Sequence, residues 1–197
     1  MADKQRKLPK QARSWQRYNH ILDTAAQLFE TEGVTTVTTN HIADAATVSI
    51  GSLYQFFPQK EAIIEALIER YQEALYAVFP QHHSPSKPIE AVIQKVLTSF
   101  MTLQQEQVGF QAIMIGIEGT ELAYLNTSMQ ATIIGGIANI LTLYYPKLDN
   151  TQSKLCATIS FSISVGIMSL ENLSPEIRLE QMVMAISTYQ KAFIKSL

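Results

Sequence analysis

The sequence contains a single cysteine, Cys156, in 197 residues, so no disulfide can form within the chain. Its first residues are positively charged but lack the apolar block of a secretory signal. The longest run without charge, residues 122–146, contains Asn126, Gln130 and a pair of glycines, which makes it too polar to span a membrane. These absences favour a cytoplasmic protein without membrane contact.

Motifs that would indicate an enzyme are also missing. The four histidines have no cysteine or carboxylate at the spacing of a metal site, and His82 and His83 stand in a Pro/Ser segment where solvated side chains are usual. No glycine-rich phosphate loop and no nucleophile motif occurs. Glu118 and Glu121 flank Gly119, and such a pair caps helices far more often than it catalyses. We therefore expect no enzymatic activity, no metal and no cofactor.

Charge is distributed unevenly along the chain. The net charge of -2 divides into +2 over residues 1–60, with seven basic and five acidic side chains, and -4 over residues 61–197, with eight and twelve. Six of the basic side chains stand in the first twenty residues: Lys4, Arg6, Lys7, Lys10, Arg13 and Arg17. A basic arm on a mildly acidic protein suits a polyanion at one end of the molecule. A solvated tail without a partner is the alternative.

Apolar residues recur at helical spacing along most of the chain, and no hairpin signal occurs. Residues 159–167 alternate like a strand, but no other segment offers a strand partner, so we predict helix there as well. The expected fold is all-α. Breaks at Gly, Pro, Ser and Asn give about nine helices, at 17–32, 40–46, 50–57, 59–79, 89–107, 110–117, 121–145, 151–172 and 174–197.

The first three of these helices form a unit whose shape suits a helix-turn-helix. Thr39 and Ser49 are expected to cap the second and third helices. Short helices are marginal alone, so Ile42, Val48, Leu53 and Phe57 are expected to pack on Ile21, Ala25 and Phe29. An outward face then remains at Ile50, Gly51, Ser52, Tyr54 and Gln55, whose mixture of donors, acceptors and apolar carbon suits the DNA major groove.

Three stretches carry a resemblance to a known family. ILDTAAQLFETEG at 21–33, TTNHIADAA at 38–46 and VSIGSLYQFFPQKEA at 48–62 resemble the N-terminal domain of the tetracycline-repressor (TetR) family, over about a third of the chain. The resemblance implies a homodimeric, ligand-responsive transcription regulator, usually a repressor. It divides the chain into a flexible basic arm (1–16), a helix-turn-helix DNA-binding domain (17–65) and a ligand-binding and dimerisation domain (66–197).

The family pattern also assigns DNA contacts. It places Thr39, Tyr54 and Lys60 at phosphates, and hydroxyl and ammonium groups are suitable partners for them. Core packing is an alternative for Tyr54 and is favoured for Phe56. Thr47 stands where the family commonly has glycine, and Ile50 where a basic residue is frequent; a β-branched residue resists positive φ, so the turn is expected to be altered or strained. The full expected DNA-binding set is Thr38, Thr39, Asn40, Ser49, Ile50, Gly51, Ser52, Tyr54, Gln55 and Lys60.

The remaining two thirds of the chain offer two tasks, ligand binding and dimerisation. Gly135-Gly136 inside a helix indicates a close helix crossing, a break or a ligand against backbone, and the crossing is favoured. An apolar effector is expected at Phe100, Met101, Gln104, Phe110, Met114, Tyr124, Met129 and Phe161, although plain core is favoured for each of them. A four-helix dimer interface is expected from the last two helices, at Ile159, Ile163, Ile167, Leu170, Met182, Val183, Ile186 and Tyr189, with intrachain core as the alternative.

The sequence therefore predicts a repressor that binds a palindromic operator in double-stranded DNA as a homodimer and is released by a small-molecule effector. The rival interpretation is a ligand-binding or protein-partner module whose helix-turn-helix no longer binds DNA. An enzyme is a distant third.

Overall fold

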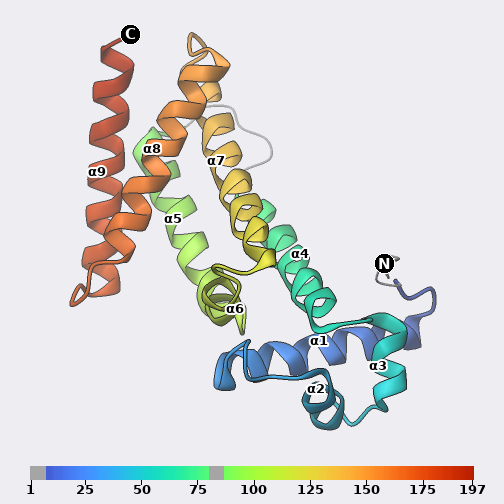
Figure 1. Ribbon diagram of the computed structural model, residues 1–197. Coiled ribbons are helices and arrows are strands. Elements are labelled where there is room, and N and C mark those ends of the chain that lie inside the picture. The colour runs from blue at the N-terminus through green and yellow to red at the C-terminus, as the bar shows by residue number, and fades with distance from the viewer. Residues whose placement is uncertain (1–7, 80–86) are drawn as a thin grey trace. The chain divides into compact units, whose positions relative to one another are not determined.

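The computed structural model describes residues 8–79 and 87–197, and every regular element within them is helical (Figure 1). The expectation of an all-α fold is confirmed. Lys4, Arg6, Lys7 and the His82–His83 pair lie outside the described residues. The elements are α1 (Ala12–Glu32), α2 (Thr39–Ala45), α3 (Ile50–Phe56), α4 (Lys60–Val78), α5 (Ile89–Glu106), α6 (Phe110–Gly116), the 3₁₀ turn η1 (Glu121–Ala123), α7 (Tyr124–Tyr144), α8 (Asn150–Met168) and α9 (Pro175–Lys195).

Several helix starts differ from the prediction. Helix α1 begins at Ala12 rather than at Arg17, so the last residues of the expected arm are helical. The cap of α2 is Thr38 and not Thr39, because the Thr38 side chain accepts a hydrogen bond of 3.2 Å from the backbone N–H of His41. Helix α4 begins at Lys60 rather than at 59. The expected cap of α3 is confirmed, since Ser49 Oγ accepts from the Ser52 N–H at 3.2 Å.

The segment with the strand-like alternation lies inside α8, as predicted. Asp149 and Gln152 form a capping box that fixes the start of this helix. The serines in the alternation donate their hydroxyls to carbonyls one turn earlier, as Ser160 does to Cys156 O at 2.8 Å. The buried face of α8 consists of small residues, which lets α9 approach closely: Ser153, Cys156, Ala157 and Ser160.

The described residues divide into two compact units. Unit 1 comprises Met1–Glu73 with Gln104–Ser128, and unit 2 comprises Ala74–Leu103 with Met129–Leu197. Unit 1 thus joins the helix-turn-helix segment to α6, which packs against α1. The functional division at residues 65 and 66 is a different kind of boundary and stays a prediction.

The core of unit 1 holds the two short helices α2 and α3 against α1. The side chains expected to clamp them are buried, except that Val48 is only half-buried. Tyr18 of α1 adds to the clamp, because its ring lies 4.7 Å from that of Phe57 between centroids. The fully or almost fully buried residues of the clamp are Ile21, Ala25, Phe29, Ile42, Leu53 and Phe57.

The core of unit 2 is built by α5, α7, α8 and α9. Its buried cluster comprises Ile89, Ile93, Ala138, Leu141, Cys156, Ala157, Met182 and Ile186. The glycine pair in α7 marks a close crossing, as expected: a Cβ on Gly136 would lie 2.6 Å from the Phe79 ring, whereas a Cβ on Gly135 would meet nothing within 4 Å. Gly136 is therefore fixed by packing, and Gly135 is not.

Candidate nucleic-acid interface

Helix α3 presents a mixed polar and apolar face to solvent. Ile50 is 36% exposed and Tyr54 47%, while Leu53 is buried on the opposite side. A Cβ on Gly51 would meet nothing within 4 Å, so the backbone there is open to a partner. Ser49 and Ser52 join their hydroxyls at 2.8 Å at the start of the helix, and Gln55 is exposed near its end. This face has the size and chemistry that a major groove accepts.

Phe56 does not belong to that face. Its side chain is 9% exposed and meets Tyr18 edge to face, with the ring centroids 5.9 Å apart. The favoured assignment of Phe56 to the core is confirmed. Tyr54, by contrast, is exposed, so packing does not account for it.

Tyr54 connects the two short helices. Its hydroxyl lies 3.1 Å from Thr39 Oγ1, so a residue of α2 and a residue of α3 hold one another at the surface. Since each hydroxyl has one hydrogen and two lone pairs, the pair keeps capacity for a further hydrogen bond to a phosphate oxygen. Asn40 is exposed beside Thr39, while Thr38 has the capping role described above.

Lys60 has a structural role that the sequence did not reveal. Its ammonium donates to the carbonyl oxygens of Val34 (2.8 Å) and Val37 (3.0 Å), in the loop between α1 and α2. An ammonium group has three hydrogens, so one is left for a phosphate. The two carbonyls hold the charge in place, and Lys60 can fix the loop and contact DNA at once.

The turn between α2 and α3 is strained at Thr47. This residue adopts φ 54, in the left-handed region that a β-branched side chain disfavours. The preceding carbonyl, of Ala46, accepts a hydrogen bond from His20 Nε2 of α1 at 3.1 Å. Backbone bonds from Thr47 N to Asp44 O and from Val48 N to Ala43 O, both 3.0 Å, also hold the turn. The strain expected from the departure at Thr47 is therefore present, and His20 contributes a clamp that the sequence did not reveal.

The residues expected to bind an effector are divided between the two units. Gln104, Phe110, Met114 and Tyr124 belong to unit 1, and Phe100, Met101, Met129 and Phe161 to unit 2. Phe110 packs edge to face on Tyr71, Met129 is buried, and Tyr124 is exposed and donates to Glu65. A cavity does lie within unit 2, but none of these residues lines it. The walls of this cavity are aliphatic, and the expected effector residues stay a prediction.

Two of the expected dimer residues are buried within the chain, and the other six keep some exposed surface. Met182 and Ile186 are buried in the core of unit 2, and Ile163, Ile167, Val183 and Tyr189 pack against that core. Ile159 is half-buried and Leu170 is exposed. The large apolar side chains that are exposed on these helices are different ones: Leu155 and Val165 of α8, and Ile177 and Met184 of α9.

Residues 8–79 and 87–197 contain neither a candidate metal site nor a candidate membrane span. No group of three or more His, Cys, Asp or Glu side chains in this part of the chain could hold a metal ion. No helix of the same residues combines the length and hydropathy that a membrane-spanning segment needs.

Two short helices at a tight turn, clamped on a longer helix and exposing a mixed face, define a DNA-binding protein of the helix-turn-helix class. Comparison with known families agrees and is more specific. Residues 21–67 match the family described as "Bacterial regulatory proteins, tetR family", and residues 88–188 match "Tetracyclin repressor-like, C-terminal domain". The chain belongs to the TetR family of transcription regulators, which are not enzymes.

The curated proteins similar to this chain have names of more than one kind. Nucleoid occlusion factor SlmA of Actinobacillus pleuropneumoniae serotype 5b (strain L20) is 29% identical over 111 residues, which cover 56% of this chain and 54% of that protein. HTH-type transcriptional repressor KstR2 of Rhodococcus jostii (strain RHA1) is 29% identical over 83 residues, 42% of this chain and 41% of that protein. The chain spans about half the length of these curated relatives.

Solved structures match over most of the chain. The SmeT–triclosan complex superposes with a TM-score of 0.69 at 17% identity, over 90% of this chain and 91% of that one. At this identity the likeness shows the fold alone.

Proposed function

We propose that the protein is a dimeric repressor that binds a palindromic operator through the α3 face and is released by a small molecule bound in the larger domain. The exposed face of α3, which includes Tyr54, is the observation that carries the proposal. KstR2 is a repressor by name, and the solved structure of SmeT is a complex with triclosan, which supports both halves of the proposal. The effector would shift the population toward a dimer whose recognition helices are wrongly spaced.

The proposed dimer uses the exposed apolar side chains of α8 and α9. Leu155 is 50% exposed and Met184 54%, and neither belongs to the buried core cluster of unit 2. Replacing either by glutamate should yield monomers, because a charge would be buried between two copies without a partner. Sedimentation of Leu155→Glu and Met184→Glu tests this, and a dimer that survives both would place the interface elsewhere.

Salt-dependent binding to the DNA flanking the protein's own coding region tests the proposed function. Affinity falls with salt by a slope of about 0.9 per neutralised phosphate. Lys60→Met should therefore lower the slope by roughly two in a dimer, one contact per subunit. Tyr54→Phe removes a neutral hydroxyl, so it should weaken binding to all sequences by about tenfold while the slope stays unchanged. A folded dimer without any salt-sensitive binding would contradict the proposal.

Base readout needs a separate comparison. Gln55→Ala and Ser52→Ala should change which operator variants are preferred, because these side chains are expected to meet base edges. Gln27→Ala, an exposed glutamine of α1, is the matched control and should change nothing. An equal loss on every sequence from the α3 variants would show that they contact phosphate and that readout lies elsewhere.

SlmA offers a second candidate, since its name describes a nucleoid occlusion factor rather than a repressor. If this chain acted on the nucleoid as a whole, we would expect it to bind many sites rather than a few promoters. Mapping the bound sites in cells separates the two, because a repressor concentrates at a few promoters.

A further inference from the structure

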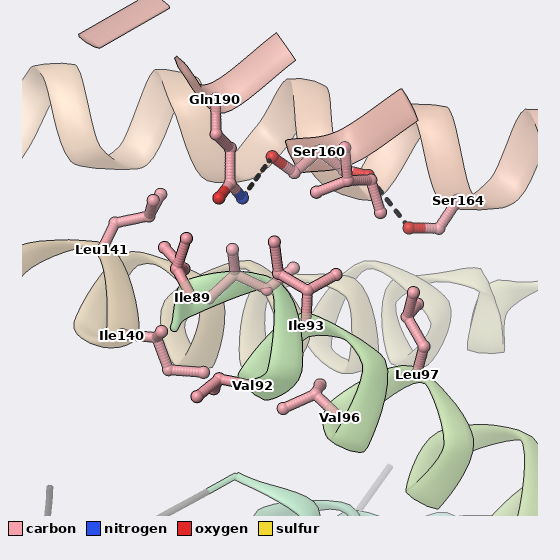
Figure 2. Close-up of a pocket in the computed structure, with 12 residues that line it drawn as sticks. Ile89, Val92, Ile93, Val96, Leu97, Ile140, Leu141, Ser160, Ser164 and Gln190 are labelled. Atoms are coloured by element: carbon pink, nitrogen blue, oxygen red, sulfur yellow. Dashed lines mark hydrogen bonds between the residues drawn. The ribbon is translucent and has the colours of Figure 1, made fainter. Parts of the chain in front are cut away.

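A small cavity lies inside unit 2, between the aliphatic faces of α5 and α7 and the polar ends of side chains on α8 and α9 (Figure 2). The centre of a water-sized molecule can occupy about 50 Å³ of it, and the whole hollow, including the part open to solvent, is about 420 Å³. The smaller volume exceeds the roughly 10–15 Å³ that one water needs and is about a third of the 150 Å³ cavity that holds benzene in another protein. It therefore has room for the end of a small molecule, whose remainder would extend toward the opening.

One polar atom in this cavity has no partner. Gln190 is 2% exposed, and its Oε1 accepts no hydrogen bond from any described residue. Buried amide oxygens are almost always paired, because an unpaired one has lost its hydration without compensation. Gln190 Oε1 is therefore a free acceptor, and none of the described residues supplies a donor for it.

The hydrogen bonds of Ser160 determine the orientation of the Gln190 amide. Ser160 Oγ donates its only hydrogen to Cys156 O at 2.8 Å, so toward Gln190 it can only accept. The atom 3.1 Å from Ser160 Oγ must then be Nε2 of Gln190, which leaves Oε1 on the other side. Figure 2 shows that oxygen directed toward the side of Leu141 and Ile89, away from Ser160. Ser160 thus orients the Gln190 amide so that Oε1 remains free to accept a hydrogen bond.

The remaining walls of the cavity restrict the kind of molecule that can carry this donor. They are formed by aliphatic side chains such as Val92, Ile93, Val96, Ile140, Leu141 and Ile186. None of the described lining residues is charged or aromatic, so an ion would lose its hydration without a counter-charge and a cation would find no ring face. Ser164 cannot donate either without breaking its bond to Ser160 O at 2.9 Å. The cavity therefore favours a neutral, aliphatic molecule that carries a hydrogen-bond donor.

We infer that Gln190 is the specificity residue of an effector cavity that takes a neutral aliphatic alcohol or a similar single-donor molecule, with the donor bonded to Gln190 Oε1 and the chain in the aliphatic part. That this molecule acts as an effector rests on the proposed function. Its binding does not rest on it, because all the residues that line the cavity belong to unit 2.

The test compares two isomers that differ in one donor. Binding of 1-hexanol and of methyl pentyl ether is measured on the full-length protein without DNA, from shifts in ¹H–¹⁵N spectra. The alcohol should bind about three to ten times more tightly than the ether, as one neutral hydrogen bond predicts. In Gln190→Met, which keeps the volume but removes the acceptor, this ratio should fall to about one while the ether binds at least as well.

Two further variants control the experiment. Gln181→Met alters a glutamine of α9 that does not line the cavity, so the ratio should stay as in the wild type. Ser160→Ala removes the acceptor that orients the Gln190 amide but keeps the amide itself, so the ratio of the two affinities should decrease but stay above one. This variant replaces Gln190→Met as the test if Gln190→Met does not fold. Equal affinity of the two isomers for the wild type, or a ratio that Gln190→Met leaves unchanged, would overturn the inference and indicate that water alone satisfies Oε1.

A separate measurement distinguishes this inference from the proposed function. If the ratio depends on Gln190 but 1-hexanol leaves DNA affinity unchanged, the cavity assignment stands and release by its ligand is refuted. If DNA binding is salt-sensitive but the two isomers bind equally, the proposed DNA function stands and the cavity assignment is overturned.

Discussion

Replacing Gly109 by alanine should destabilise unit 1 more than the same substitution at Gly33 or Gly119, the other glycines of that unit with positive φ. Gly109 has φ 78, and its N–H donates to Glu30 Oε2 at 3.0 Å. An added Cβ would lie 2.6 Å from the carbonyl oxygen of Ala26, a backbone atom of α1. Because α1 carries the clamp for α2 and α3, this atom cannot shift without moving the helix on which the DNA-binding face depends.

The magnitude follows from three contributions. An L side chain in the left-handed region costs about 1–2 kcal/mol, and the smaller backbone entropy lost by alanine returns about 0.5–1 kcal/mol. Overpacking against rigid atoms adds about 1–3 kcal/mol. We therefore expect Gly109→Ala to lower the free energy of unfolding by about 1.5–4 kcal/mol.

Gly119→Ala is the matched control. Gly119 also has positive φ, 73, but a Cβ there would meet nothing within 4 Å. It should therefore cost only the conformational part, about 0.5–1 kcal/mol. The difference between the two variants isolates the contact with Ala26.

The assay is urea unfolding followed by tryptophan fluorescence. Trp15 is the only tryptophan and lies in α1, with its ring centroid 5.3 Å from that of Tyr18, so its emission reports on unit 1. Equal costs for Gly109→Ala and Gly119→Ala would refute the reasoning, because the backbone contact would then contribute nothing. A difference opposite in sign would show that the loop before α6 is not held against α1 in solution.

Three further predictions address the turn, the core of unit 1 and the thiol. Thr47→Gly should raise the stability of unit 1 by about 0.5–1 kcal/mol in the same assay, because it relieves the left-handed strain, whereas a loss would mean the side chain supports the turn. Tyr71→Phe should cost about 1–2 kcal/mol, because Val108 O loses the 2.6 Å hydrogen bond that it accepts from the Tyr71 hydroxyl. Burial raises the pKa of Tyr71 from 10.0 to about 12, so the stability from its neutral hydroxyl is present below pH 10 and is lost as pH rises through 12. Alkaline titration of tyrosine absorbance should show one late-titrating group fewer in Tyr71→Phe than in the wild type. Burial also raises the pKa of the Cys156 thiol, so iodoacetamide should modify it only on unfolding in urea, and rapid modification of the native protein would contradict its burial.

Local features of the DNA-binding segment could be predicted from the sequence. The cap at Ser49, the burial of Leu53 and Phe57 and the exposure of Tyr54 all follow from helical periodicity and from contacts within one turn. Such interactions depend on neighbours in the chain, which the sequence gives directly. The strain at Thr47 could also be predicted, since a β-branched residue is disfavoured at positive φ.

Contacts between distant residues could not be predicted in the same way. Lys60 bonds to Val34 and Val37, His20 bonds to Ala46, and Gln190 bonds to Ser160, each across more than twenty positions. A lysine or a glutamine has the same local pattern whether it is solvated or fixed. Which hydrogen-bond partners such a side chain finds depends on how separate segments of the chain pack together.

The cavity and the dimer surface illustrate the same difference on a larger scale. Periodicity showed that α8 and α9 each have an apolar stripe, but the small residues Ser153, Ala157 and Ser160 turned a different face of α8 toward α9 than the isoleucines alone suggested. The aromatic and Met side chains suited either a ligand or plain core, and core was favoured, whereas the cavity lies where aliphatic side chains leave a gap beside Gln190.

The sequence by itself determined that the chain is helical, that its N-terminal helices form a helix-turn-helix and which face of α3 is free, because these depend on spacing along one helix. The tertiary structure alone decided which stripe of α8 became core, where a cavity remained and which amide oxygen was left without a donor. Those outcomes depend on how side chains from separate helices fill a shared volume, and no single segment contains that information.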